Sequence, residues 1–341
     1  MKSFVVALVF SLRFISPAAA TASPGHWTTG LSGNPIYALA VDPSNPEVVY
    51  AGGHGGIFKS TDGGITWTFF HVGSPDISMV HHLTIDPQNS VYLYASTASD
   101  FGGGRLFKST DGGESWSLIL KSAGPQILVI DPQHPTVLYG SVSGAGFIKS
   151  VDGGVNWTVI GLEPGVTSWN LDVSALVLDQ TNPTTLYAGA LDGGVLKSTD
   201  AGTTWVSILW AGDNQPVEDP RDLRIYSINA IAVAPTQPIT LYVGTHGRGI
   251  LKSTDGGMKW QKLDHGLLYV LALAVDPATP AVLYAATYDS VFMSADSGEH
   301  WQNLQFPSST PPGINAITVN PIGTVLYVGT NNGVYVYRLG K

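Results

Sequence analysis

The chain has 341 residues, and its 25 acidic and 16 basic side chains give a formal net charge of −9 at neutral pH, so we expect no nucleic acid partner. Its 40 glycines, 22 prolines and 12% charged residues are typical of a turn-rich β protein and exclude a disordered chain. The absence of cysteine excludes disulfides and thiolate metal sites, and we expect neither a cofactor nor a metal ion.

Residues 1–22 have the pattern of a secretory signal peptide. Lys2 precedes an apolar run over residues 4–10, and small residues follow up to Ala22, near which cleavage is expected. An arginine close to the apolar run leaves an uncleaved leader as the weaker alternative. No later stretch has the length and apolarity of a membrane span. The segment predicts a secreted or periplasmic protein whose folded domain covers residues 23–341.

The first repeat unit begins with three short apolar segments that are separated by turns. An Asp42-Pro43 turn joins residues 37–43 to residues 48–53, and residues 56–59 follow a glycine-rich turn. Short apolar segments bounded by such turns predict β-strands. The same three segments recur through the rest of the chain, so each unit supplies at least three strands.

A box of the pattern S-x-D-x-G-x-x-W follows the third strand of each unit. The six boxes are residues 60–67, 109–116, 150–157, 198–205, 253–260 and 294–301. They recur at a mean interval of about 47 residues, the length of one propeller blade. Within a box, Asp is expected to cap the amides of a tight turn, Gly to take a positive φ and Trp to bury its ring. Because the turn repeats and lacks the oxygen ligands of a calcium loop, its aspartates are predicted to be structural.

The two ends of the chain complement each other. Residues 314–337 form a seventh unit without a box or a Trp, whereas Trp27 lies on an isolated segment that matches the fourth strand of a unit. The sequence therefore predicts an all-β fold, a single seven-bladed β-propeller of four-stranded antiparallel blades, whose ring is closed by the N-terminal strand. An open β-solenoid is the main alternative, but it would not need a returned strand.

The boxes resemble the Asp-box, or BNR, repeat, and the resemblance covers nearly all of residues 26–341. Proteins with this repeat include sialidases, xyloglucanase-type glycoside hydrolases, sortilin-like receptors and photosystem II assembly factors of the Ycf48 type. These families bind or cleave different molecules, so the resemblance implies the fold and leaves the activity open.

This chain departs from each of those families at the residues that carry activity. It lacks the Arg-Ile-Pro segment of sialidases, and residues 51–56 read Ala-Gly-Gly-His-Gly-Gly where xyloglucanase-type enzymes have Arg-Thr-Asp-x-Gly-Gly. Those enzymes also place a second propeller across their cleft, which 341 residues do not accommodate. Ycf48-type factors have an arginine-rich surface, whereas this chain has six arginines, and sortilin-like receptors add cysteine-rich modules that are absent here.

A ligand site is expected on the face opposite the boxes, where the loops between second and third strands meet the long crossovers between blades. Trp169 and Trp210 are the only tryptophans outside the repeat pattern, and they lie in the two longest crossovers, residues 161–172 and 210–226. An exposed ring beside charged groups can stack on a sugar or hold a peptide. Anchoring of a long loop is the alternative role.

Arginines gather in the same region. Arg221 and Arg224 lie in the second crossover, and the next loop adds His246 and Arg248. Such a cluster can bind carboxylates or phosphates, although nearby acidic side chains could equally neutralise it. His81-His82 is not expected to bind a metal ion, because neighbouring strand residues point to opposite faces.

The sequence thus predicts an exported, monomeric, non-catalytic binding or scaffolding propeller that recognises a glycan or protein partner. The alternative is a polysaccharide-acting glycoside hydrolase of the xyloglucanase-like type, which would need two carboxyl groups at a defined separation. The candidate acids are Asp192, Asp289 and Asp213. A purely structural surface protein is the third possibility.

Overall fold

The computed structural model contains β-strands and turns. It describes residues 25–73, 77–99, 104–122, 124–143, 146–160, 172–191, 194–209, 227–236, 239–263, 266–307 and 313–340. In this part of the chain no helix is long and apolar enough to cross a membrane.

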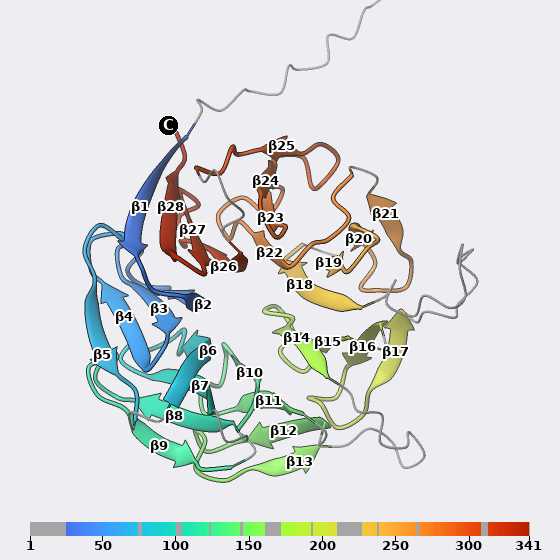
Figure 1. Cartoon of the computed structure of the whole chain (residues 1–341). Coiled ribbons are helices and arrows are strands. Elements are labelled where there is room, and N and C mark those ends of the chain that lie inside the picture. Colours follow the sequence, from blue (N-terminus) through green and yellow to red (C-terminus); the bar gives the residue numbers. More distant parts are fainter. Residues whose placement is uncertain are drawn as a thin grey trace, which may run out of the picture.

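Twenty-eight strands form seven four-stranded antiparallel sheets arranged in a ring (Figure 1). Blade one contains β2 (Ile36–Val41), β3 (Val49–Gly53), β4 (Gly56–Ser60) and β5 (Thr68–His71). Blade two contains β6 (Ile77–Ile85), β7 (Leu93–Ser99), β8 (Arg105–Ser109) and β9 (Ser117–Leu120). Blade three contains β10 (Ile127–Ile130), β11 (Leu138–Val142), β12 (Gly146–Ser150) and β13 (Thr158–Ile160).

The remaining blades repeat this order. Blade four contains β14 (Val173–Leu178), β15 (Leu186–Ala190), β16 (Gly194–Ser198) and β17 (Val206–Leu209). Blade five contains β18 (Ile228–Ala234), β19 (Thr240–Thr245), β20 (Ile250–Ser253) and β21 (Gln261–Leu263). Blade six contains β22 (Ala272–Val275), β23 (Leu283–Ala286), β24 (Val291–Ser294) and β25 (Gln302–Asn303).

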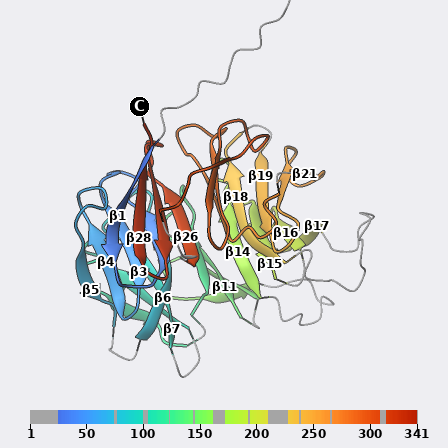
Figure 2. The same ribbon diagram turned by 45° about the horizontal axis from the view of Figure 1, so that its top comes forward.

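Blade seven joins the two ends of the chain, as the sequence predicted. It contains β26 (Ile314–Val319), β27 (Val325–Thr330), β28 (Gly333–Arg338) and β1 (His26–Ser32). β1 lies beside β28 in antiparallel register, with Trp27 opposite Tyr337 (Figure 2). The indole N–H of Trp27 donates to the carbonyl of Leu304 in blade six at 2.8 Å. The closing strand therefore also ties blade seven to its neighbour.

The hydrophobic core lies between neighbouring blades. One cluster joins Ile36 and Val49 of blade one to Tyr327 and Val336 of blade seven, all of them buried. The innermost strands contact each other around the whole ring, from β2 and β6 to β26 and β2. Because each blade buries both faces of its sheet, the middle strands are apolar on both sides, as the fully buried β3 and β11 show.

The box forms the turn that the sequence predicted. In the first box, the hydroxyl of Ser60 donates to Asp62 Oδ1 at 2.8 Å and accepts the N–H of Gly64, also at 2.8 Å. Asp62 Oδ1 accepts the N–H of Thr66 at 2.8 Å, and Gly64 has a φ of 85°. The Thr66 hydroxyl also donates to the carboxylate of Asp62. These hydrogen bonds, and the one from the Thr66 hydroxyl most of all, lower the pKa of Asp62 to about 2.

The box tryptophans are less buried than the sequence predicted. Only Trp205 is buried, with 5% of its surface exposed, whereas the other five are half-buried. The reason is that the ring stays over its own turn at the outer rim: the indole N–H of Trp67 donates to the carbonyl of Gly64 at 3.1 Å.

Hydrogen bonds to the boxes also join neighbouring blades. In blade two, the Tyr94 hydroxyl and Lys108 Nζ both donate to the carbonyl of Gly153, in the box of blade three, at 3.2 Å. Lys149, Lys197 and Lys252 make the equivalent bond to the next box. The box is therefore a link between blades as well as a turn within one blade.

Candidate binding faces

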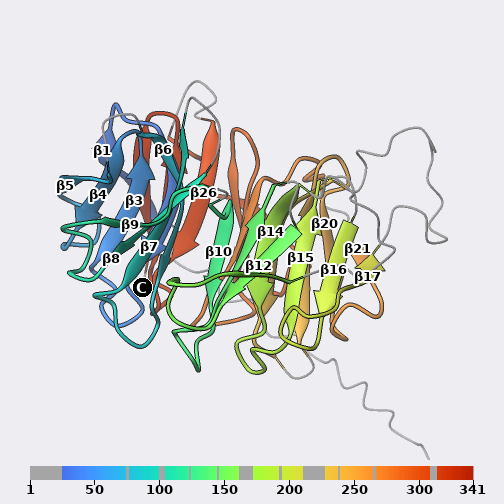
Figure 3. The ribbon, with the colours of Figure 1, turned by 90° about the horizontal axis from the view of Figure 1, so that it is seen from below.

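The loops of the ring lie on two faces (Figure 3). The box face carries the boxes and the turns between first and second strands, which touch each other: the N–H of Gly63 donates to the carbonyl of Glu47 at 2.9 Å. The loop face carries the loops between second and third strands and the crossovers between blades. This division agrees with the one expected from the sequence.

On the loop face, the β19–β20 loop of blade five is bound to the crossover that leads into blade six. The amides of Gly247 and Gly249 both donate to the carbonyl of Leu268, at 2.8 and 3.2 Å, and the N–H of Val270 donates back to the carbonyl of Thr245 at 3.1 Å. The hydroxyl of Thr245 closes the loop by donating to the carbonyl of Gly249 at 2.9 Å. These bonds fix the backbone of both segments.

Side chains on this fixed backbone form an exposed apolar and aromatic surface. The ring of Tyr269 is 52% exposed and meets His246 edge to face, with 5.0 Å between ring centroids. Leu268 is 51% exposed, and Tyr288 in the β23–β24 loop is 59% exposed. The N–H of Leu271 donates to the carbonyl of Ala286, so the crossover ends beside that loop.

We name this surface the His246 patch. It consists of His246, Arg248, Leu268, Tyr269 and Tyr288. Of the site residues predicted from sequence, His246 and Arg248 lie together in it, because one short loop holds both. Trp169, Trp210, Arg221 and Arg224 lie outside the described residues. Leu268, Tyr269 and Tyr288 were not among the predicted residues. Residues 267–270 are an apolar run, and nothing in that run shows which side chains face solvent.

Few carboxyl groups lie on the described part of the loop face. Among the described residues it carries Asp172 in blade four and Asp289 in blade six, and each accepts a hydrogen bond from a loop hydroxyl. Asp289 Oδ1 accepts from Thr287 at 3.1 Å, a short-range bond typical of a turn. Asp192 and Asp213 lie outside the described residues.

Xyloglucanase-type enzymes are expected to carry a carboxylate in the β3–β4 loop of blade one. In this chain the loop carries His54, which pairs with Tyr37 of β2. Nε2 of His54 lies 3.0 Å from the hydroxyl of Tyr37, and the two rings meet edge to face. This pair can donate and accept hydrogen bonds at the loop face, but it supplies no acid.

A β-bulge recurs on the innermost strands near the loop face. Tyr37, Ser174 and Asn315 are three of the bulged residues. The side chain of Asn315 donates to the carbonyl of Ile36 in the next blade at 3.0 Å, and Ser174 makes the same kind of bond to Ile228. Polar side chains at this position therefore join blades.

His81 occupies the same bulge in blade two, so the regular alternation assumed for His81-His82 does not hold. His82 Nε2 lies 2.8 Å from the carbonyl of Leu128, whereas Nδ1 of His81 is buried with no partner in the described part of the chain. Burial, and then the neighbouring His82, lowers the pKa of His81 to about 4. No group of three metal-ligating side chains occurs among the described residues.

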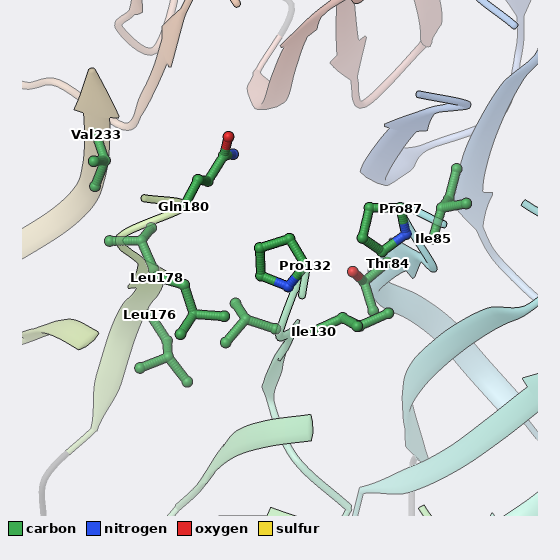
Figure 4. A pocket seen from close by; sticks show the side chains of 11 residues that line it. Thr84, Ile85, Pro87, Ile130, Pro132, Leu176, Leu178, Gln180 and Val233 are labelled. Carbon is green, nitrogen blue, oxygen red and sulfur yellow. The ribbon is translucent and has the colours of Figure 1, made fainter. Parts of the chain in front are cut away.

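A cavity of about 330 Å³ opens on the box face, at the inner ends of blades two to five (Figure 4). We name it the inner cavity. Nine of its eleven lining side chains are apolar, and the turns that follow the innermost strands form its rim. Residues that define it include Ile85, Pro87, Ile130, Pro132, Leu178 and Gln180.

Solved structures that are similar to this chain have the same propeller architecture. No family model matches the chain, and no curated protein matches it. Among solved structures, it is similar to the GH74 xyloglucanase of Xanthomonas campestris, with a TM-score of 0.72 and 18% identity over 93% of this chain. The fold is that of a seven-bladed β-propeller. The chain covers only 54% of that xyloglucanase, so it spans about half of its length.

Two YCF48 structures are matched over nearly their whole length. YCF48 from Cyanidioschyzon merolae has a TM-score of 0.67 and 16% identity, with 92% of this chain and 98% of that chain covered. A structure of YCF48 bound to D1 peptide has a TM-score of 0.69 and 15% identity, with 96% and 98% covered. At these identities the likeness shows the fold alone, and the neighbours include both enzymes and a peptide-binding protein.

Proposed function

We propose that this chain is an exported, non-catalytic scaffold that binds an extended segment of a partner protein at the His246 patch. The observation that carries the proposal is the exposure of Leu268, Tyr269 and Tyr288, each by half or more, on backbone that is already fixed by hydrogen bonds. Fixed loops lose little conformational entropy on binding, and aromatic rings give large contact area with few rotatable bonds.

The chemistry of the patch favours a peptide over a glycan. Leu268 adds aliphatic surface that can cover an apolar side chain, while Arg248 can pair with a carboxylate. The whole-length match to YCF48, one structure of which holds D1 peptide, supports a single propeller that binds protein. A glycan that stacks on Tyr269 and Tyr288 is the competing ligand.

Glycoside hydrolysis has less support. The described loop face offers Asp172 and Asp289 in blades that are not adjacent, and both carboxylates accept bonds within loops. A general acid and its partner must face the same bond from defined distances. Release of reducing sugar from a polysaccharide panel would reverse this preference and direct attention to Asp192, Asp213 and Asp289.

The proposed site extends to four residues known only from their place in the sequence. Trp169 and Trp210 lie in the crossovers before blades four and five, and Arg221 and Arg224 precede the blade that carries His246. We expect the double variant Trp169→Ala, Trp210→Ala to fold normally and to bind its partner more weakly. Normal binding by that variant would restrict the site to the His246 patch.

Export is proposed from residues 1–22 and is tested separately. Expression of the full chain in a secreting host should give a product whose N-terminus, read by mass spectrometry, lies just after Ala20 or Ala22. An intact N-terminus on the exported protein would contradict cleavage.

The peptide-binding proposal is tested by selection followed by affinity measurement. The mature protein selects ligands from a phage library of random peptides, and calorimetry gives the Kd of an enriched peptide. Tyr269→Ala and Tyr288→Ala should each raise the Kd by about tenfold, as expected for aromatic anchors. Tyr92→Ala is the matched control, because Tyr92 is an exposed tyrosine on the box face. Equal losses in all three variants, or no enriched peptide, would contradict the proposal.

A further inference from the structure

We propose that the inner cavity is a second docking site, which takes an apolar side chain from a cationic segment of a partner protein. The cavity lies on the box face, whereas the His246 patch lies on the loop face, so this inference is independent of the proposed function.

The shape and wall of the cavity suit a short apolar segment. About 330 Å³ holds one or two aliphatic side chains and is at the low end for a small-molecule site. The floor is aliphatic, from Ile85, Ile130 and Leu178, and the rings of Pro87 and Pro132 stand at the rim (Figure 4). Proline rings at the rim are rigid, so the rim loses little conformational entropy when a ligand binds.

Thr84 and Gln180 are the two polar side chains of this wall, and the repeat pattern marks Gln180. Proline follows the first strand at the equivalent position in the other six blades, whereas blade four has Gln180. The Gln180 side chain is exposed and lines the cavity. Its amide can both donate to and accept from a peptide backbone, which an additional proline could not do.

The electrostatics of the rim select a cationic partner. Asp86, Asp131 and Asp179 each lie next to a lining residue, and each Oδ1 accepts two amides of its turn at 2.8–3.2 Å. No residue that lines the cavity is charged. Of the sixteen Asp and Glu among the described residues, fourteen lie on this same face beside seven basic side chains, Lys59, Lys108, Lys149, Lys197, Lys252, Lys259 and Arg338, so its described part has a net negative charge. An apolar mouth in an acidic face attracts a segment with lysine or arginine beside its apolar residue.

The charge also argues against other occupants. A second copy of the chain that docked by its own box face would bring an equally acidic surface. A neutral apolar compound would gain nothing from the carboxylates around it.

The probes are three fluorescein-labelled peptides, KKLPLKK, EELPLEE and KKSGSKK, titrated with the mature protein and followed by fluorescence anisotropy. Only KKLPLKK should bind saturably, and its Kd should rise with salt because the attraction is screened. Gln180→Lys, which adds a cation at the mouth, should raise that Kd by about tenfold. Gln133→Lys is the matched control, because Gln133 is exposed in a neighbouring turn and does not line the cavity.

The inference is overturned if KKLPLKK does not bind, or if KKSGSKK binds as tightly, which would show charge attraction alone. Equal binding of EELPLEE would remove the charge argument. Equal losses in Gln180→Lys and Gln133→Lys would place the peptide outside the cavity. None of these results depends on the loop face, so they leave the His246 patch to its own test.

Discussion

At the scale of single residues, the box shows how a few polar groups organise a turn. Ser150 is 1% exposed, and its hydroxyl donates to Asp152 Oδ1 at 2.8 Å while accepting the N–H of Gly154 at 2.9 Å. A buried N–H without a partner is costly, so the serine matters as much as the aspartate that gives the repeat its name.

Ser150→Ala should therefore lower the free energy of unfolding by about 1–2 kcal/mol, because the Gly154 amide stays buried without its acceptor. Urea denaturation followed by tryptophan fluorescence measures the change. Ser117→Ala, at an exposed position on β9, is the control and should change stability by less than about 0.5 kcal/mol. Equal effects of the two substitutions would contradict the role assigned to the box serine.

Acid should act on the fold in two steps. The pKa of His81 is lowered by burial to about 4 from its ordinary 6.5, so the unfolded chain binds this proton first and stability falls as pH drops from 6.5 towards 4. The pKa of Asp62 is lowered to about 2, so its contribution is present above pH 3.8 and is lost as pH falls towards 2.

The melting temperature as a function of pH tests this order. His81→Gln should weaken the decline between pH 6.5 and 4 without removing it, because burial also lowers the pKa of His82, and should leave the decline below pH 4 unchanged. His134→Gln, which replaces a histidine with a 70% exposed side chain, should keep both declines. A profile that is unaltered by His81→Gln would show that this imidazole is not what acid titrates first.

At the scale of elements, the bonds between blades follow the presence of boxes. A lysine precedes the box in blades one to five, and the next blade has a box in each case. Blade six has Met293 at this position, and the next blade has no box. The hydroxyl of Tyr284 in blade six is buried without a partner in the described part of the chain, as is that of Tyr327 in blade seven. Blade seven faces the first box, and there Arg338 donates to the carbonyl of Gly63 at 2.9 Å.

Lys197→Met should cost about 1 kcal/mol, because Lys197 Nζ donates to the carbonyl of Gly256 at 2.9 Å. Met293→Lys should lower the free energy of unfolding, because the new ammonium group would meet no box carbonyl and would lose part of its hydration. Chemical denaturation of both variants makes the comparison. Stabilisation by Met293→Lys would contradict this account of the blade interface.

Repeated features were predictable from the sequence, and features set by the path of a crossover were not. The boxes and the closing Trp27 follow from residue identity at fixed spacing. The lysine before five of the six boxes can also be read from the sequence, but its partner lies in the next blade, so only the assembled ring shows its role. Exposure of Tyr269 depends on how residues 266–270 cross between blades, which no local pattern fixes. The sequence shows that Gln180 replaces the proline of the other blades, but only the structure shows that it lines the cavity.

At the scale of the whole molecule, one strand closes the ring, and the described residues of the two faces differ in their number of carboxyl groups. Trp27 packs on Phe306 and Tyr337, with ring centroids 4.8 and 4.9 Å apart, and bonds to Leu304. Among the described residues, most acidic side chains lie on the box face, whereas the loop face carries the exposed rings of Tyr269 and Tyr288. The two proposed binding sites therefore lie on opposite sides of the ring.

Trp27→Ala should destabilise the protein by about 3 kcal/mol, because it removes a large ring from the seam that joins the chain ends. Trp27→Phe keeps part of the ring contact and should cost less. Urea titrations of both variants measure the difference. A loss below about 1 kcal/mol for Trp27→Ala would contradict a closing role for β1.

Hydrogen–deuterium exchange with and without a selected peptide tests the proposal that a partner binds the loop face at the His246 patch. The peptide should slow amide exchange in residues 245–250 and 266–271, while the box amide of Gly154 exchanges at an unchanged rate. Slower exchange confined to the box face, with no change in those two segments, would contradict it.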